Sequence, residues 1–447
     1  MMDKIIELLK DNPKIYAWNI MSSKKESYQL FFIKQELDMN RKVSTKEYAI
    51  NIFTFKEDKK KNKIGHSKFK VYSSMSEDEI KEKALSEENV KKHIEGKEQI
   101  KICEYSLNDF YTFPKKTTIK QINKEYAFGS QNIKDAAFIA ADALFEADKF
   151  DKGYINSSEI FINTDEVRFV DSKGNDFHFT NQNGIIELVT SWNEKNEEIE
   201  LYKCFEFDHL DTNFIQRQAN ELLLEASNRI KAIPTPSLNG YKVLLTKEYV
   251  KDFFIHLANK AKTDSIYNRM SDFHVSYKLQ DNNENVDLIT LKLEPTMKNS
   301  TKSMPFDKEG IVLKKIVCIE NGVVKNLWGS NAKSQYLQKP VYGTYSNYFV
   351  NIGTLTNEEL VLENYIEIVS LSDFIIDSLT GDFAGEIRLA YMYSKSKEKT
   401  MITGGSISGN VYKSINSIRL FNESEQINNF IGPKNILLDN ITFNKAK

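Results

Sequence analysis

Two prolines one residue apart, Pro234 and Pro236, interrupt the chain near its middle. They follow the segment 211–231, in which apolar residues recur at helical spacing. A helix cannot continue through such a pair, because proline lacks an amide hydrogen and drives the residue before it to an extended conformation. Since 447 residues also exceed the usual size of one domain, the sequence predicts a boundary here, with domains at 1–232 and 233–447.

Strand patterns dominate the beginning of the chain. Segments 27–33 and 47–55 are rich in Tyr, Phe and Ile with partial alternation, which predicts strands. The lysine-rich run 56–63 is expected at an exposed hairpin tip. A nucleic-acid patch is the alternative interpretation, but Glu57 and Asp58 dilute its charge.

Two further helices and a meander complete the N-terminal half. Segment 76–94 opens with a capping box, and segment 132–149 has the clearest amphipathic pattern. Strands are expected at 166–171 and 176–180 around a Gly-containing turn, and again at 184–192. The N-terminal domain is therefore predicted to be an antiparallel sheet flanked by helices.

Beyond the prolines, short strands predominate. A strand at 241–245 precedes a helix at 246–263, and Asn321-Gly322 between apolar runs is a strong hairpin signal. Further strands are expected at 286–293, 360–371, 386–394 and 435–443. The predicted fold class is α+β, with two domains, the second mainly β with a few helices.

Charge and composition exclude some classes of function. The 61 basic and 63 acidic residues nearly balance, at a formal charge of −2, and only seven of the basic residues are Arg. A dedicated nucleic-acid binder would show a basic excess, so no direct nucleic-acid partner is expected.

Cysteine usage and hydropathy indicate the compartment. Cys103, Cys204 and Cys318 are odd in number and widely spaced, as expected for buried thiols in a reducing cytoplasm. The N-terminus lacks an apolar signal core, and the most apolar stretch, 136–145, is too short to cross a bilayer. We therefore expect a soluble cytoplasmic protein without a membrane partner.

The sequence contains no HExxH, GxxxxGK[ST] or GxSxG motif. His256 is expected on the flank of the 246–263 helix as a partly exposed residue, and His274 can approach it only through the tertiary structure. Asp373, Asp377 and Asp382 surround a Gly-containing turn. They are interpreted as solvated turn acids, with a glycosidase pair or a hard metal site as the alternative.

The glycine-rich stretch 403–410 is either a turn between two elements or a place where backbone approaches a peptide or anion closely. Its tentative peptide-binding residues are Gly404, Gly405, Ser406, Gly409 and Asn410. No catalytic residue and no metal ligand follows from residue chemistry alone.

Motifs in the C-terminal third resemble those of the TldD/PmbA family. Thr380-Gly381-Asp382-Phe383 within 372–386, followed by 402–410, resembles the family segments TGDFSxG and GxTIxGN. Weaker similarities occur in the same order at 155–161, 170–174, 305–310 and 321–325. Members of the family are described as modulators of DNA gyrase and as candidate zinc-dependent proteases.

The resemblance also implies a branch within the family. TldD-like members carry HExxxH on a helix and a late Cys, whereas PmbA-like (TldE-like) members lack both and serve as the partner subunit. The nearest alignment places His256 on the first His, Leu257 on the Glu, Lys260 on a Gly and Ala261 on the second His. Because no Cys follows Cys318 either, the chain resembles the PmbA-like branch.

The resemblance implies a PmbA/TldE-like subunit of a TldD/PmbA-type metallopeptidase that acts on unfolded or modified peptides. The chain itself would lack the zinc site, so no cofactor is expected in it and zinc is expected only in a TldD-like partner. The expected partners are that subunit or a second copy of this chain, and the unfolded peptide. Two alternatives remain, an autonomous hydrolase with a dispersed site, such as carboxylates or His256 with His274, and a regulatory interaction protein that modulates gyrase.

Overall fold

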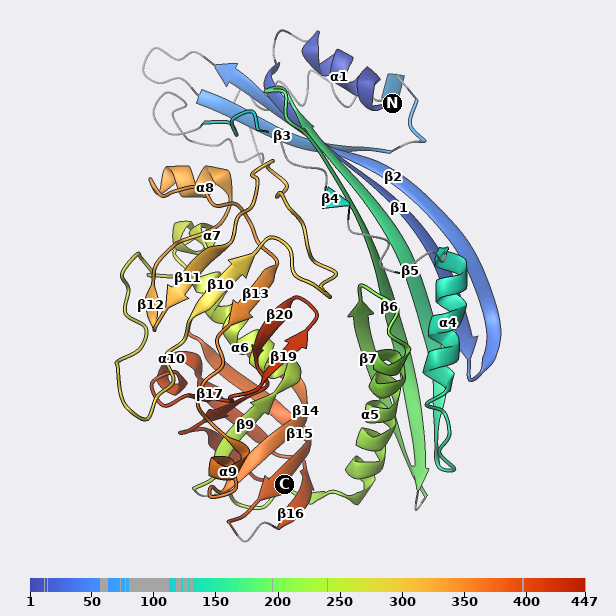
Figure 1. The fold of residues 1–447 in the computed structure, drawn as a ribbon, viewed down its shortest axis with the longest axis vertical. Helices are drawn as coiled ribbons and strands as arrows, with labels where there is room; N and C mark the ends of the chain where they lie inside the picture. Colours follow the sequence, from blue (N-terminus) through green and yellow to red (C-terminus); the bar gives the residue numbers. More distant parts are fainter. Residues whose placement is uncertain are drawn as a thin grey trace.

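The computed structural model describes residues 1–11, 13, 15–56, 63–72, 74–76, 78–79, 112–117, 122–123, 128, 132–194, 196–238, 240–395 and 398–446. Figure 1 shows a long curved sheet from the N-terminal half beside a more compact body from the C-terminal half. The helix predicted from residue 76 is described only at its start, where Ser76 and Glu79 exchange the hydrogen bonds of a capping box. Cys103 lies outside the described residues.

The N-terminal sheet has the strand order β3-β2-β1-β5-β6-β4, and β7 also pairs with β6. Its strands are β1 (Ile15–Ile33), β2 (Glu36–Lys56), β3 (Lys63–Tyr72), β4 (Ile122–Asn123), β5 (Gly153–Asp171), β6 (Asp176–Glu194) and β7 (Glu197–Phe207). All neighbours are antiparallel except β4 and β6. The predicted strands and meander are confirmed, and β2 pairs with β3 up to Lys56 and Lys63, although the predicted tip, 57–62, lies outside the described residues.

Helices α4 (Ile133–Phe145) and α5 (Thr212–Lys231) cover one face of this sheet. The side chain of Asn132 accepts the first free amides of α4, as an N-cap residue does. Small residues such as Ala136 and Ala140 are fully buried, which lets α4 pack closely on α5 and β5. A short helix, α1 (Met2–Lys10), buries Ile5 and Leu9 against the far part of the sheet.

The proline pair ends α5 as predicted. Ala232 is extended, and β8 (Ile233–Pro234) pairs in parallel with β16 (Lys399–Thr403) of the C-terminal half. The amide of Thr235 continues this pairing by donating to the carbonyl of Thr403. The division into domains at 1–232 and 233–447 stays a prediction.

The C-terminal half contains two sheets around one core. One has the order β12-β11-β10-β13-β20-β19, and the other β18-β21-β9-β14-β15-β16-β8, with β17 joining β15 to β22. The strands are β9 (Lys242–Thr246), β10 (Leu291–Glu294), β11 (Ile316–Glu320), β12 (Val323–Val324), β13 (Asn347–Val350), β14 (Tyr365–Ile376), β15 (Asp382–Tyr393), β17 (Ser406–Asn410), β18 (Arg419–Leu420), β19 (Ser424–Ile427), β20 (Phe430–Pro433), β21 (Asn435–Leu438) and β22 (Thr442–Asn444). The helices are α6 (Lys247–Lys260), α7 (Thr263–Tyr267), α8 (Asn331–Tyr336), α9 (Asn357–Leu360) and α10 (Val411–Ser414). The predicted α+β class is therefore confirmed.

Two strand predictions were wrong at their beginnings. Residues 286–290 are irregular, because their amides bond to side chains: Ile289 donates to Gln280 and Thr290 to Asn351. The strand expected at 360–371 begins only at Tyr365, because Leu360 is the last residue of α9, which Thr356 begins with a capping box. By contrast, the hairpin at Asn321-Gly322 is confirmed, with both residues at positive φ.

The two halves meet at an aromatic cluster. Phe169, Phe177 and Phe179, on the sheet face that α4 and α5 do not cover, contact Phe306 from a C-terminal loop. Helix α5 also touches β15 and β16. None of the helices in the described ranges combines the length and the apolar run that would let it span a bilayer.

Candidate functional site

Helix α6 carries the side chains of the candidate site on one face and core residues on the other. Val250, Phe253, Phe254 and Leu257 are fully buried among residues of both C-terminal sheets. Ala261, also fully buried, follows the last helical residue, so the predicted helix at 246–263 is confirmed with a slightly earlier end. This packing fixes the direction in which the remaining face of α6 points.

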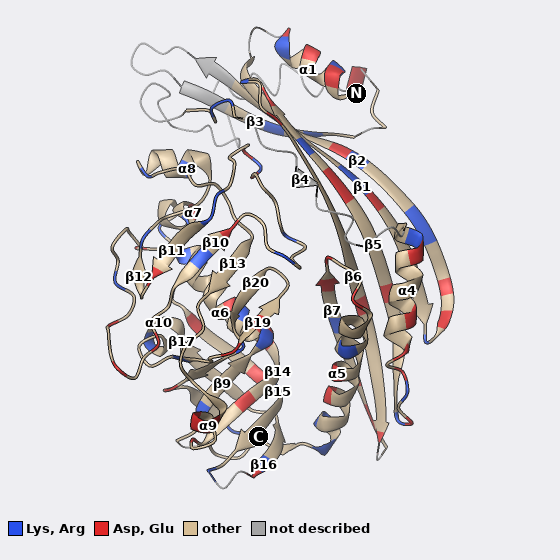
Figure 2. Cartoon of the chain, in the orientation of Figure 1, with Lys and Arg blue, Asp and Glu red and all other residues tan. Residues whose placement is uncertain are grey.

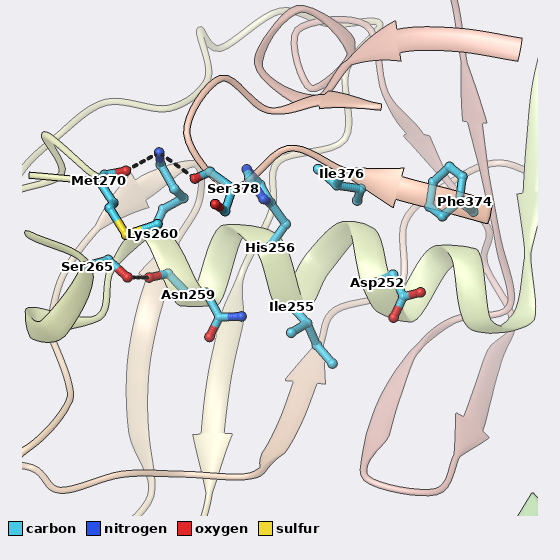
Figure 3. A pocket seen from close by; sticks show the side chains of 10 residues that line it. All are labelled: Asp252, Ile255, His256, Asn259, Lys260, Ser265, Met270, Phe374, Ile376 and Ser378. Carbon is cyan, nitrogen blue, oxygen red and sulfur yellow. Dashed lines mark hydrogen bonds between the residues drawn. The ribbon is translucent and has the colours of Figure 1, made fainter. Parts of the chain in front are cut away.

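That remaining face borders a pocket of about 270 Å³ (Figure 3). One wall is α6, and the others come from the segment around α7 and from the end of β14. The lining residues are Asp252, Ile255, His256, Asn259, Lys260, Ser265, Met270, Phe374, Ile376 and Ser378. The pocket is small, and its polar groups come mostly from the helix.

His256 is only 8% exposed, although the sequence indicated a partly exposed residue. Its Nε2 lies 3.2 Å from the hydroxyl of Tyr412. Burial, and secondly the positive charge of Lys260, lower the pKa of His256 to about 4. The imidazole is therefore neutral at physiological pH, and it is held in place by the phenol.

Lys260 is the second buried polar residue of this face, at 6% exposure. Its Nζ donates to the carbonyl of Met270 at 2.6 Å, and to those of Ser378 and Leu379 at 3.3 and 3.0 Å. An ammonium has three donors, so these carbonyls use all of them. Burial lowers the pKa of Lys260. Through these hydrogen bonds, Lys260 links the end of α6 to the loop after α7 and to the turn after β14.

The turn after β14 is built around Asp377. Its Oδ1 accepts from the amides of Leu379 and Thr380, at 2.9 and 2.6 Å, and these bonds lower the pKa of Asp377. Gly381 has a φ of 74°, and a Cβ there would lie 2.6 Å from the ring of Tyr412. Only glycine fits both the conformation and the contact.

Asn410 joins this turn to the following helix. Its Nδ2 donates to the carbonyl of Thr380 at 3.0 Å and to Asp382 at 2.8 Å. Its Oδ1 accepts from the amides of Tyr412 and Lys413, which caps α10. The two motifs that indicated the family in the sequence thus meet in space, beside the pocket over α6.

Sequence comparisons show which known proteins resemble this chain. Residues 239–445 match the family described as PmbA/TldA metallopeptidase C-terminal domain. The metalloprotease PmbA homolog of Buchnera aphidicola is 23% identical over 403 residues, which cover 83% of this chain and 84% of that protein. Residues 239–445 therefore belong to the TldD/PmbA family. A metalloprotease of Methanocaldococcus jannaschii is 28% identical over 229 residues, or 46% of this chain and 48% of that one.

Solved structures share the fold over the whole length. A protein of Thermotoga maritima, described as a candidate modulator of a DNA gyrase, superposes with a TM-score of 0.75 at 16% identity, covering 100% of this chain and 99% of that one. TldE of Thermococcus kodakarensis superposes with a TM-score of 0.74 at 15% identity, covering 100% of both. These structures therefore share the α+β fold of this chain.

The tentative peptide-binding residues lie along β17 and the turn before it. Gly404 and Gly405 both have a φ of 75°, and a Cβ on Gly405 would lie 2.3 Å from the carbonyl of Asn444. Ser406 accepts a side-chain hydrogen bond from Asn444, and Gly409 packs against the ring of Phe383.

Strand β17 pairs with β15 throughout and with β22 over residues 406–408. Of the five residues, Asn410 is hydrogen-bonded to the turn beside the pocket. Peptide binding by these residues stays a prediction.

The other candidates do not assemble into one site. His274 is exposed and contacts Asp272 and Tyr277. Within the described ranges, no group of three or more His, Cys, Asp and Glu side chains has the geometry of a metal site. Cys318 is buried as predicted, but Cys204 is exposed, because it lies on the face of β7 opposite the buried Phe205.

Sequence reasoning missed Lys260 and Tyr412. Lys260 follows His256 by four residues, so a charged residue one helical turn after the histidine, on the same face of the helix, was the available signal. Tyr412 carried no comparable signal, because only the folded chain brings it to α6.

Proposed function

We propose that this chain is a PmbA/TldE-like subunit of a TldD/PmbA-type metallopeptidase, and that it does not itself hold the catalytic zinc. Its work would be to position unfolded or modified peptides for a TldD-like partner. The proposal depends on the residues that α6 carries at the positions where, by the family resemblance, TldD-like members have their zinc ligands.

These residues do not fit a zinc ion. Zinc sites need three or four N, S or O donors around the metal. Here His256 faces Tyr412, while the positions expected for Glu and the second His are the fully buried Leu257 and Ala261. The ammonium of Lys260 lies on the same face of α6 as His256 and would repel a cation. We therefore derive no zinc chemistry from this chain.

A second feature supports peptide holding. A groove of about 1000 Å³ lies between β7 and α5 on one side and β14 and β15 on the other. Within the described ranges, β6 is the one partner of β7, so the other edge of β7 is free to pair with an extended peptide. Tyr202 and Leu224 line the groove and are 62% and 47% exposed, which offers apolar contacts to peptide side chains.

The proposed partner is a TldD-like subunit or a second copy of this chain. A stable interface buries about 1,200–2,000 Å² or more, and we expect it chiefly after Pro236. Direct nucleic-acid binding is not part of the proposal, because Lys and Arg are interspersed with acidic residues in both parts of the molecule (Figure 2). We place the pair in the cytoplasm, where unpaired cysteines stay reduced.

The test compares the purified chain, a TldD-like subunit from the same genome, and their mixture. We expect chelator-sensitive cleavage of an unfolded peptide from the mixture, and neither cleavage nor stoichiometric zinc from this chain alone. Light scattering should show a dimer or a complex with the partner. A monomer under both conditions, or chelator-sensitive turnover by this chain with one equivalent of zinc, would contradict the proposal.

A variant separates the proposal from an autonomous hydrolase. His256→Gln keeps a polar side chain beside Tyr412 but removes the imidazole. We expect the mixture to keep its turnover with this variant, because the imidazole performs no chemistry. Loss of turnover with intact assembly would favour the dispersed hydrolase site instead.

A further inference from the structure

A second cavity, of about 370 Å³, lies where the N-terminal sheet meets the C-terminal half. Strands β5 and β6 form one side, and the loop over residues 295–308 forms much of the other. Phe179, Met304 and Phe306 supply an apolar wall. The exposed side chains of Lys302 and Lys308 also border the cavity, so it reaches the surface.

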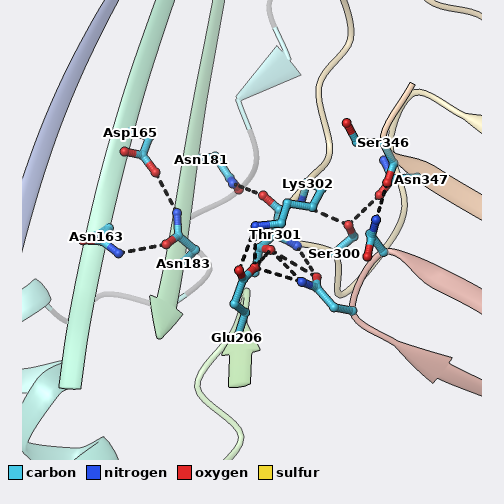
Figure 4. Close-up of polar contacts among 12 residues, drawn as sticks. Asn163, Asp165, Asn181, Asn183, Glu206, Ser300, Thr301, Lys302, Ser346 and Asn347 are labelled. Carbon is cyan, nitrogen blue, oxygen red and sulfur yellow. Dashed lines mark hydrogen bonds and ion pairs between the residues drawn. The ribbon is translucent and has the colours of Figure 1, made fainter. Parts of the chain in front are cut away.

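Asn181 leaves a hydrogen-bond acceptor unused in this wall. The residue is 6% exposed, and its Nδ2 donates to the carbonyl of Thr301 at 3.1 Å (Figure 4). This bond fixes the orientation of the amide, because only the NH₂ group can face a carbonyl. The Oδ1 atom is buried without a partner. Buried polar atoms without partners are rare, so this one calls for an explanation.

Asp165 lies next to Asn181 and is held in a defined orientation. The two residues are direct partners in the register of β5 and β6, and both line the cavity. Asn183 donates to Asp165 Oδ2 at 2.7 Å and accepts from the fully buried Asn163 at 2.9 Å (Figure 4). This chain of amides positions the carboxylate and leaves its second oxygen for another donor.

Two of the nearby donors, Lys302 and Thr301, are already engaged. Lys302 forms an ion pair with Glu206 at 2.7 Å, and Thr301 also donates to that carboxylate. Lys25 lies opposite Asp165 in the register of β1 and β5, but its side chain is exposed and no ion pair joins the two. The sheet side of the cavity therefore has an excess of acceptors and a negative charge.

We propose that this cavity binds a primary ammonium group that carries a neighbouring apolar side chain, as at the N-terminus of a peptide that begins with an apolar residue. The carboxylate of Asp165 would accept N–H donors of the ammonium, and charge-assisted bonds of this kind are strong. Oδ1 of Asn181 would accept a further donor after a small movement of its side chain toward the cavity. The apolar group would contact Phe179 and Phe306. The proposal uses no residue of α6, so it stands or falls separately from the proposed function.

Calorimetry with three probes tests this site on the full chain. L-Leucinamide and the peptide Leu-Gly-Gly carry the ammonium, and N-acetyl-L-leucinamide lacks it. We expect binding of leucinamide, with the acetylated probe about ten-fold weaker or more. Binding of Leu-Gly-Gly as well identifies a peptide N-terminus as the ligand, whereas binding of leucinamide alone identifies a small amine.

Three variants locate the binding. Asp165→Asn keeps the shape of the side chain and removes its charge, and it should weaken leucinamide about ten-fold or more. Glu166→Gln is the matched control, since it removes an exposed carboxylate from the next position of β5, on the other sheet face. If Asp165→Asn fails to fold, Asn181→Leu removes the unpaired carbonyl and should likewise weaken leucinamide about ten-fold or more. Equal affinity for the acetylated probe, no binding of any probe at millimolar concentration, or full affinity in the Asp165 or Asn181 variant would overturn the proposal.

Discussion

The pocket over α6 and the cavity beneath the N-terminal sheet both contain buried polar side chains, but they differ in how these are satisfied. At α6, Lys260 meets three carbonyls and His256 meets Tyr412. In the sheet cavity, Oδ1 of Asn181 meets nothing. An unsatisfied buried polar group costs about 1–3 kcal/mol. The buried polar side chains of the α6 pocket have hydrogen-bond partners within the protein, whereas Oδ1 of Asn181 has none.

The largest expected effect comes from rewriting α6 toward a zinc helix. Leu257→Glu with Ala261→His should lower the free energy of unfolding by roughly 2–5 kcal/mol or more, because both positions are fully buried in apolar packing. Residues five apart on a regular helix also point about 140° apart, and a third ligand is missing, so we expect no zinc site. Urea unfolding and zinc titration measure both outcomes.

Leu257→Met is the control for that double variant, and it should cost less than about 1.5 kcal/mol. Tight stoichiometric zinc binding by the double variant, with an unchanged melting temperature, would show that the α6 pocket can hold a metal ion and would contradict this prediction.

A smaller effect is expected when the donor of the α6 pocket is removed. Lys260→Met keeps most of the side-chain length but leaves three carbonyls without their ammonium, which should cost about 1–3 kcal/mol. Lys251→Met, elsewhere on α6, serves as the control and should change stability little. Equal unfolding curves for the two variants would mean that water replaces the ammonium without loss.

The pH dependence of stability tests His256. Its folded pKa of about 4 lies below its ordinary value of 6.5, so the unfolded chain binds more protons between these two pH values. Because the unfolded chain binds this proton and the folded chain does not, the free energy of unfolding falls as the pH drops from about 6.5 toward 4. The expected decrease is about 1–2 kcal/mol after allowance for partial solvation. Between pH 7 and pH 4.5, the free energy of unfolding of the His256→Gln variant should decrease less than that of the original chain. Parallel losses would contradict a buried neutral imidazole.

The smallest effect is expected in the sheet cavity. Asn181→Leu removes one hydrogen bond to Thr301 but also removes the unpaired carbonyl, so the two contributions nearly cancel. We expect a change in the free energy of unfolding within about 1 kcal/mol, in contrast to Lys260→Met. A loss as large as that of Lys260→Met would show that Asn181 is a structural residue and would remove the contrast between the two regions.

Much of the fold could be predicted from the sequence where the signal is local. The helical spacing in 132–149 and 211–231 and the Asn321-Gly322 turn each depend on residues close in the chain, and all three are confirmed. The strand expected at 286–293 failed at its start because side chains outside the segment, Gln280 and Asn351, accept hydrogen bonds from its amides. Apolar residues alone do not show which partner a backbone amide will find.

The candidate site could be predicted only in part. The helix with His256 was found from its period and from the family resemblance. Its surroundings were not, because Tyr412 and Ser378 are more than 100 residues away along the chain and reach α6 only through the sheet of β14, β15 and β17. The predicted partly exposed His256 is buried for that reason.

The sequence by itself indicated the family, through the motifs around Asp382 and Asn410, and it placed the apolar residues Leu257 and Ala261 on the core side of the helix that carries His256. Only the tertiary structure decided that Lys260 has all its acceptors and that Asn181 lacks a donor. The physical reason is that a hydrogen bond requires atoms within about 3 Å of each other at a suitable angle. Such distances arise between segments far apart in the chain, and no local pattern of residues specifies them.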